Sequence, residues 1–205
     1  MKRPPQAALA QGASSILGRA LTAREMDLFS RYLGLLVKWQ RSHRLIGSTD
    51  EMWIVEHLFL DSLLFLRLLP STVRSLVDLG SGAGLPGVPI KIVRSDIEVT
   101  LVESRRRRAS FLSAVVRELA LSQTHVLADR LESRMPELEG RVDAVVMRCA
   151  GSVDELMPTA ARLLAPQGVV IASGPPVPRP LPRGEWVLVP GLRPSSSRRF
   201  AVYRS

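Results

Sequence analysis

Four glycines between residues 80 and 87 constrain the fold of this chain more than any other feature. They follow a short apolar run, and the segment reads Val77-Asp78-Leu79-Gly80-Ser81-Gly82-Ala83-Gly84-Leu85-Pro86-Gly87. Two templates fit this spacing, because Gly80, Gly82 and Gly84 form GxGxG while the last three glycines form GxGxxG, the dinucleotide-binding pattern between a strand and a helix. Glycine lets a backbone approach a ligand closely, so the segment predicts a nucleotide-like cofactor.

Two acidic residues bear on which cofactor this is. Glu103 follows the apolar run 97–102, roughly 20 residues further on, and an acid at that point can accept hydrogen bonds from ribose hydroxyls in either case. Asp78 lies two residues before the first glycine, where it would repel the pyrophosphate of NAD but attract a ligand that carries an ammonium and a sulfonium. The sequence therefore favours S-adenosylmethionine over NAD. A glycine turn without a ligand is the less favoured alternative, since the preceding strand and Glu103 support cofactor binding independently.

After residue 75 the sequence alternates between short apolar runs and amphipathic helices. Such alternation is typical of a mostly parallel sheet with helices on both faces. One helix is expected over 105–120 and another after Ser152. Seven runs are candidate strands, at residues 75–79, 97–102, 125–128, 142–147, 168–172, 186–189 and 200–203. Seven strands suit the Rossmann-like α/β fold of S-adenosylmethionine-dependent methyltransferases.

The first third of the chain is expected to form an N-terminal helical extension, residues 1–72, to the cofactor-binding domain at 73–205. Residues 1–21 look loosely structured. Thr22-Ala23-Arg24-Glu25 then has the spacing of a capping box, which predicts the start of a helix. A second helix is expected over 52–69, and the charged residues within it indicate a buried helix and not a membrane span.

Charge and cysteine content narrow the function classes. The formal net charge of +9 indicates a polyanionic partner such as a nucleic acid, although a generally basic proteome is an alternative explanation. Cys149 is the only cysteine, which excludes a disulfide framework and a thiolate metal cluster and fits a cytoplasmic protein. The N-terminal segment is a poor signal peptide because polar residues interrupt it. We therefore expect no metal, no membrane partner and, by default, a monomer.

Two groups of side chains add candidate substrate contacts. His57 and Asp61 are four residues apart on the second predicted helix, so they could hydrogen-bond across one turn. Such a pair either pins the helical extension to the cofactor domain or lines a substrate pocket. The four arginines at 105–108 begin the helix after Glu103, where positive charge opposes the helix dipole. Phosphate binding would explain them, and a solvated face that pairs with nearby acids is the alternative.

These segments together resemble a known family. Similarity to the small-subunit ribosomal RNA methyltransferase G family (RsmG, also called GidB) rests on the glycine turn, on Glu51-Met52-Trp53 with His57 and Leu60-Asp61-Ser62, and on Leu101-Val102-Glu103-Ser104. The resemblance extends from about residue 22 to the end of the chain. It implies methyl transfer from S-adenosylmethionine to N7 of a guanine in 16S rRNA, free or in the 30S subunit, by a cytoplasmic bacterial enzyme.

The same resemblance implies roles for individual residues. The backbone around Gly80 and Leu85 would contact the methionine part of the cofactor, and Glu103 would bind its ribose. Arg148 would lie at the edge between cofactor and substrate, and Arg198 matches the arginine that opens the family's last strand. The implied cofactor-binding residues are Asp78, Gly80, Gly82, Gly84, Leu85, Glu103, Leu131, Glu132 and Arg148. The residues expected to meet the RNA are Arg44, His57, Asp61, Arg105, Arg106 and Arg198.

Three positions depart from the family pattern, all on the presumed RNA side. Arg44-Leu45-Ile46 stands where the family usually has Asn-Leu-Thr, and Ser173-Gly174 stands where it has Lys-Gly. The spacing from His57 to Asp61 is one residue longer than is usual. These departures bear on the target nucleotide more than on the cofactor.

Methylation at guanine N7 makes modest demands on side chains. The N7 lone pair is free, so attack on a methyl sulfonium needs no deprotonation, and catalysis can depend on positioning and electrostatics. No catalytic acid or base is therefore expected, and His57, Asp61 and Arg148 are candidates for positioning the reactants. Two alternatives stay open: a small-molecule methyltransferase or NAD-dependent enzyme, and an RNA-binding relative that has lost turnover through the changes at Arg44 and Ser173.

Overall fold

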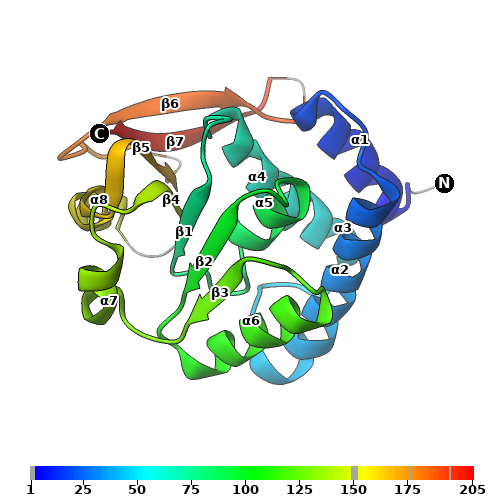
Figure 1. Cartoon of the computed structure of the whole chain (residues 1–205). Coiled ribbons are helices and arrows are strands. Elements are labelled where there is room, and N and C mark those ends of the chain that lie inside the picture. The colour runs from blue at the N-terminus through cyan, green and yellow to red at the C-terminus, as the bar shows by residue number, and fades with distance from the viewer. Residues whose placement is uncertain (1–2, 149–151, 176, 194) are drawn as a thin grey trace.

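A computed structural model describes residues 3–148, 152–175, 177–193 and 195–205, without the side chains of residues 42, 43 and 131–134. Its centre is a seven-stranded sheet with the order β3-β2-β1-β4-β5-β7-β6 (Figure 1). The strands are β1 Ser75–Leu79, β2 Glu98–Val102, β3 Thr124–Leu127, β4 Val142–Met147, β5 Leu164–Ser173, β6 Glu185–Pro190 and β7 Ser197–Arg204. The first five are parallel, while β7 is antiparallel to both β5 and β6. All seven predicted strands are confirmed.

Helices cover both faces of this sheet. α5 (Gly87–Val93) and α6 (Arg106–Glu118) lie on one face, and α7 (Leu131–Leu138) and α8 (Val153–Arg162) lie on the other (Figure 1). Successive strand residues point to opposite faces, so Leu76 of β1 belongs to the core with α5 and α6, whereas Val77 belongs to the core with α8. The predicted Rossmann-like α/β fold is confirmed.

The N-terminal residues are more ordered than the sequence predicted. They form α1 (Pro5–Leu17), so the expectation of a loose segment over 1–21 was wrong. Pro5 lies in the first turn, where a missing N–H costs little, and Gly18 ends the helix in the left-handed conformation with φ +68°. Small side chains on one side of α1 are buried against residues 55–60, and this tertiary packing stabilises the helix.

The next helix, α2 (Ala23–His43), begins with the predicted capping box. The Thr22 hydroxyl accepts a hydrogen bond from the Glu25 N–H at 3.2 Å, and the Glu25 carboxylate accepts one from the Thr22 N–H at 2.7 Å. Further along, Tyr32 is fully buried and its ring stacks on Phe59 with centroids 5.1 Å apart. The helical extension and the sheet therefore share one hydrophobic core.

The predicted single helix over 52–69 is in fact divided into four short pieces. These are α3 (Glu51–Ile54), the π-helix η1 (Val55–Leu60), α4 (Asp61–Leu63) and the 3₁₀-helix η2 (Leu64–Arg67). Hydrogen bonds in a π-helix join residues five apart, so η1 holds one residue more per turn than an α-helix would. Four of its six residues are buried, because α1 packs against it and the rings of Phe29 and Tyr32 in α2 pack on Phe59. No helix in the described part of the chain is long and apolar enough to cross a membrane.

Candidate functional site

The glycine turn leaves the carboxyl end of β1, beside the point where the strand order reverses between β1 and β4. The N–H groups of Gly80 and Ser81 both donate to the Val102 carbonyl at the end of β2, at 2.9 and 3.0 Å. Gly84 has φ +89°, and a Cβ on it would lie 2.7 Å from the Val88 side chain. Only glycine fits there, so the turn stays close to the sheet and its outer backbone, including exposed Gly80, is open to a ligand.

Asp78 lies under this turn with its side chain completely buried. One carboxylate oxygen, Oδ2, accepts a hydrogen bond from the Gly87 N–H at 2.9 Å, and the other, Oδ1, has no partner. Burial raises the pKa of Asp78 to about 7, although the Gly87 N–H and the charge of Arg148 act in the opposite direction. A buried acceptor without a partner is costly, so Oδ1 marks a place for a donor.

Arg148 follows β4 and supplies the complementary group. Its Nη2 donates to the His57 carbonyl at 2.7 Å, and its Nη1 is buried without a hydrogen-bond partner. The hydroxyl of buried Tyr32 donates to the Ala83 carbonyl, and its pKa is raised by burial and by Asp78 and lowered by Arg148. Asp78 thus has an unpaired acceptor and Arg148 an unpaired cationic donor, and the charge of Arg148 acts on Asp78. The α-ammonium and α-carboxylate of S-adenosylmethionine fit these two groups.

Glu103 ends β2 on the other side of the turn and is almost fully buried. Its Oε2 accepts a hydrogen bond from the Gly82 N–H at 3.0 Å, and its Oε1 accepts one from the Arg105 N–H at 2.8 Å. The Arg108 guanidinium lies 4.0 Å from Oε2. Each carboxylate oxygen can accept a second hydrogen bond, so Glu103 is held in place and can still receive ribose hydroxyls.

The remaining candidates for the cofactor site are placed by their backbones. Leu85 is buried at the end of the glycine turn. Leu131 and Glu132 begin α7, which follows β3 on the same edge of the sheet, and their side chains lie outside the described residues. The whole of Cys149 also lies outside the described residues.

The arginines at 105–108 do not act as one group. Arg105 is the N-cap of α6, and Arg106 and Arg107 are exposed in its first turn. Arg108 alone turns back toward an acid, Glu103. Arg44 is exposed at the C-terminal end of α2 with φ +47°, and among the described residues no hydrogen bond or ion pair engages its guanidinium. Its proposed contact with the RNA stays a prediction.

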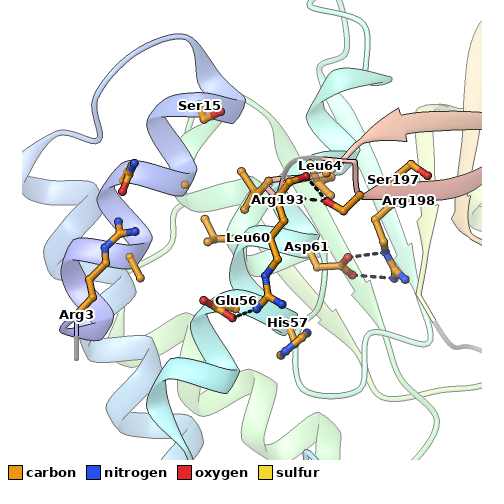
Figure 2. Close-up of a pocket in the computed structure, with 16 residues that line it drawn as sticks. Arg3, Ser15, Glu56, His57, Leu60, Asp61, Leu64, Arg193, Ser197 and Arg198 are labelled. Atoms are coloured by element: carbon orange, nitrogen blue, oxygen red, sulfur yellow. Dashed lines mark hydrogen bonds and ion pairs between the residues drawn. The ribbon is translucent and has the colours of Figure 1, made fainter. Parts of the chain in front are cut away.

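The predicted hydrogen bond between His57 and Asp61 is not formed. Asp61 instead binds two arginines, with Arg198 Nε 2.6 Å from Oδ1 and Arg148 Nε 3.5 Å from Oδ2 (Figure 2 shows the Arg198 pair). His57 is exposed, and its ring lies against that of Trp53 with centroids 5.3 Å apart. The longer π-turn separates the two side chains, and Asp61 gains charge-assisted interactions with two guanidinium groups instead. A polar link between the helical extension and the sheet is therefore present, but it consists of ion pairs from Asp61 to Arg148 and Arg198.

Two cavities flank the Arg198 side chain. One of about 430 Å³ lies between α1, η1 and the turn from β6 to β7 (Figure 2). The other, of about 860 Å³, lies between the first residues of α8, the end of β5, the Pro-rich segment after it, and Trp186. His57 and Asp61, which were expected to line a substrate pocket or to pin the helical extension, both line the smaller cavity. No sequence motif pointed to the larger one. Among the residues that the structure describes, Arg198 lines both cavities.

The sheet order, the glycine turn after β1 and the acid at the end of β2 define an S-adenosylmethionine-dependent methyltransferase. The family model GidB, described as rRNA small subunit methyltransferase G, matches residues 25–173. The chain belongs to this family.

Curated relatives agree with the family match. A protein of Chromobacterium violaceum named "Ribosomal RNA small subunit methyltransferase G" is 36% identical over 166 residues, which cover 81% of this chain and 78% of the relative. A protein of the same name from Anaeromyxobacter sp. (strain Fw109-5) is 39% identical over 168 residues, which cover 81% and 76%. Both matches span most of each chain.

Solved structures share the fold at low sequence identity. Cofactor-bound Rv0187 from MTB has a TM-score of 0.61 and 13% identity, over 98% of this chain and 97% of that one. A SAM dependent methyltransferase from Aquifex aeolicus has a TM-score of 0.53 and 18% identity, over 74% and 92%. These likenesses concern the architecture alone.

Proposed function

We propose that this protein transfers the methyl group of S-adenosylmethionine to N7 of a guanine in 16S rRNA. The observation that carries the cofactor assignment is the pair of buried, unpartnered atoms beside the glycine turn, Asp78 Oδ1 and Arg148 Nη1. Their charges complement an amino acid end, which S-adenosylmethionine has and NAD lacks. The substrate follows from membership of the family and from the names of the relatives, and the formal net charge of +9 suits an RNA partner.

The cofactor residues divide by the part of the ligand that they meet. Asp78 and Arg148 hold the amino acid end, and the backbone from Gly80 to Leu85, with Gly82 and Gly84, curves around it. Glu103 receives the ribose hydroxyls. Leu131 and Glu132, at the start of α7, border the adenine. When bound, the cofactor supplies an electrophilic methyl group next to a site that needs no catalytic base.

The larger cavity suits the target guanine. It lies at the carboxyl end of β5 beside the first residues of α8, at the edge of the sheet where ligands bind in such folds. Trp186 forms one wall, with its indole N–H donating to the Arg179 carbonyl at 2.7 Å. Aromatic and guanidinium planes hold unstacked RNA bases in many complexes. Arg198 borders the cavity, and Asp61 fixes Arg198 and Arg148 together, so Asp61 acts as a positioning residue.

The rest of the RNA meets the basic surface outside this cavity. His57 and the exposed arginines contribute there, the latter being Arg44, Arg105 and Arg106. The protein acts as a monomer in the cytoplasm. Residues 1–72 serve as a helical extension, and residues 73–205 serve as the cofactor-binding domain.

Transfer of tritium from labelled S-adenosylmethionine to 16S rRNA and to 30S particles tests this function. We expect label in one of the two substrates, at N7 of a guanine, with mapping of N7-methylguanine in rRNA from cells with and without the gene as confirmation. A variant with Arg148→Met should bind S-adenosylhomocysteine at least tenfold more weakly, because a charged hydrogen bond is lost. Cofactor binding without transfer to either RNA substrate would contradict the proposal.

A further inference from the structure

The cavity of Figure 2 has a composition that the target guanine does not explain. Three segments far apart in the sequence enclose it: α1, the η1–α4 region, and the turn between β6 and β7. Its floor is apolar, formed by Ala8, Gly12, Leu60 and Leu64, and its volume of about 430 Å³ is within the range of small-ligand sites. Its rim is polar and carries Gln11 and Ser15 from α1. A flat, partly apolar group with polar edges suits such a cavity.

The charges at the rim favour an anionic ligand. Arg3, Arg193 and Arg198 line the cavity, against the two carboxylates of Glu56 and Asp61. Arg193 is 2.8 Å from Glu56, but its side chain is 74% exposed, and exposed ion pairs of this kind contribute little. The Arg193 guanidinium can therefore exchange the carboxylate for a phosphate at small cost.

The cavity also shares a lining residue, Arg198, with the place proposed for the target base. Arg198 lines both cavities, and its pairing with Asp61 fixes it between them. The cluster of Asp61 with Arg148 and Arg198 carries a net charge of +1, so it attracts a phosphate that passes over it. Two nucleotides of one strand, joined by such a phosphate, would occupy the two cavities together.

We propose that the smaller cavity binds the base of a second, unstacked nucleotide of the RNA strand, adjacent to the methylated guanine. This inference rests on the proposed function. The base lies on the floor of Leu60 and Leu64, Arg198 meets the phosphate between the two nucleotides, and Arg193 meets the phosphate on the far side. The cavity thereby fixes which guanine reaches the methyl group, since both nucleotides must leave the stack together.

Filling the cavity from α1 tests the base site. Gln11→Trp and Ser15→Trp change exposed residues that line it, so each should fold normally. We expect each variant to bind 16S rRNA roughly 5- to 100-fold more weakly in filter binding, the range for loss of one stacked base. Affinity for S-adenosylhomocysteine, measured by calorimetry, should stay within twofold of the unmodified protein.

Removing a rim charge tests the phosphate contact. A plot of the logarithm of RNA affinity against the logarithm of salt concentration has a slope that reports the number of phosphates contacted. Arg193→Gln should lower the magnitude of this slope by about one. Arg162→Gln is the matched control, because Arg162 forms a similar exposed ion pair with Glu139 at 2.9 Å and lines neither cavity. The control should leave the slope unchanged.

The outcomes separate this inference from the proposed function. RNA affinity unchanged in both tryptophan variants would overturn the second base site, whether or not methyl transfer occurs. An equal fall in the salt slope for Arg193→Gln and Arg162→Gln would overturn the phosphate contact. Absence of methyl transfer by the unmodified protein would contradict the function alone, since binding is measured directly.

Discussion

The buried carboxyl of Asp78 makes the affinity for the cofactor depend on pH in a defined direction. Burial raises the pKa of this group to about 7 in the protein without ligand. The group is therefore largely neutral below pH 7 and becomes a carboxylate above it. Only the carboxylate pairs with the cofactor's ammonium, so binding releases a proton at low pH and affinity is lost as pH falls through 7.

The size of the effect follows from the fraction ionised. At pH 6, about one tenth of Asp78 is a carboxylate, which weakens binding about tenfold, or about 1.4 kcal/mol, relative to pH 8 for this group alone. The ligand's amino group has an ordinary pKa of about 8, so pH 5.5 to 7 is the useful window. Arg148, Glu103 and Tyr32 also face this region, but Asp78→Asn removes only the Asp78 contribution.

Calorimetry with S-adenosylhomocysteine measures this dependence. Titrations at pH 5.5, 6, 6.5 and 7 in two buffers of different ionisation enthalpy give both the affinity and the number of protons released. We expect affinity to rise with pH and nearly one proton to be released at pH 6. Asp78→Asn should bind weakly and with a flat profile. An equal slope in both proteins, or no slope in the unmodified protein, would refute the pairing of Asp78 with the ammonium.

Three further predictions concern other parts of the site. Glu103→Gln should weaken S-adenosylhomocysteine binding about tenfold, because charged hydrogen bonds to the ribose are lost; unchanged calorimetric affinity would contradict this. Gly84→Ala should lower the free energy of unfolding, measured by urea titration, by about 1–3 kcal/mol. The reasons are that φ is +89° and that the added Cβ would lie 2.7 Å from the Val88 side chain. Gly47→Ala is the control, because a Cβ there meets nothing within 4 Å. Asp61→Asn should lower the free energy of unfolding by about 3 kcal/mol and should also lower the rate of methyl transfer, since two arginines lose their counter-charge. A change in the free energy of unfolding within about 0.5 kcal/mol would show that the cluster does not stabilise the fold.

Sequence patterns were sufficient for the sheet and the glycine turn. Apolar runs of five or six residues between turns fix a buried parallel strand, and Gly80 to Gly87 leave few alternatives for the backbone after β1. The family resemblance, which the comparisons confirm, rests on these same local segments. The local sequence was enough to predict these features, because the strands and the glycine turn are defined by the conformation of a few consecutive residues.

Features that depend on distant partners could not be predicted in this way. The helix at residues 5–17 forms because small side chains pack on η1, and the segment 1–21 alone carries only a weak helical pattern. The spacing of His57 and Asp61 suggested a pair on one helix, but Asp61 binds Arg148 and Arg198, which are 87 and 137 residues further along the chain. Spacing patterns predict contacts only between residues a few positions apart, so they could not predict these ion pairs. For the same reason the larger cavity was not predicted, because its lining residues come from segments that are distant in the sequence.

The π-turn at residues 55–60 also bears on how chains of this kind change in length. An extra residue inside a regular α-helix would rotate all the following side chains about the helix axis. A π-turn accommodates the extra residue within that turn, so the residues after it keep their orientation. Removal of one residue here would leave an ordinary helical turn and keep Asp61 against its arginines. We therefore expect a version shortened by one residue to fold with the same ion cluster.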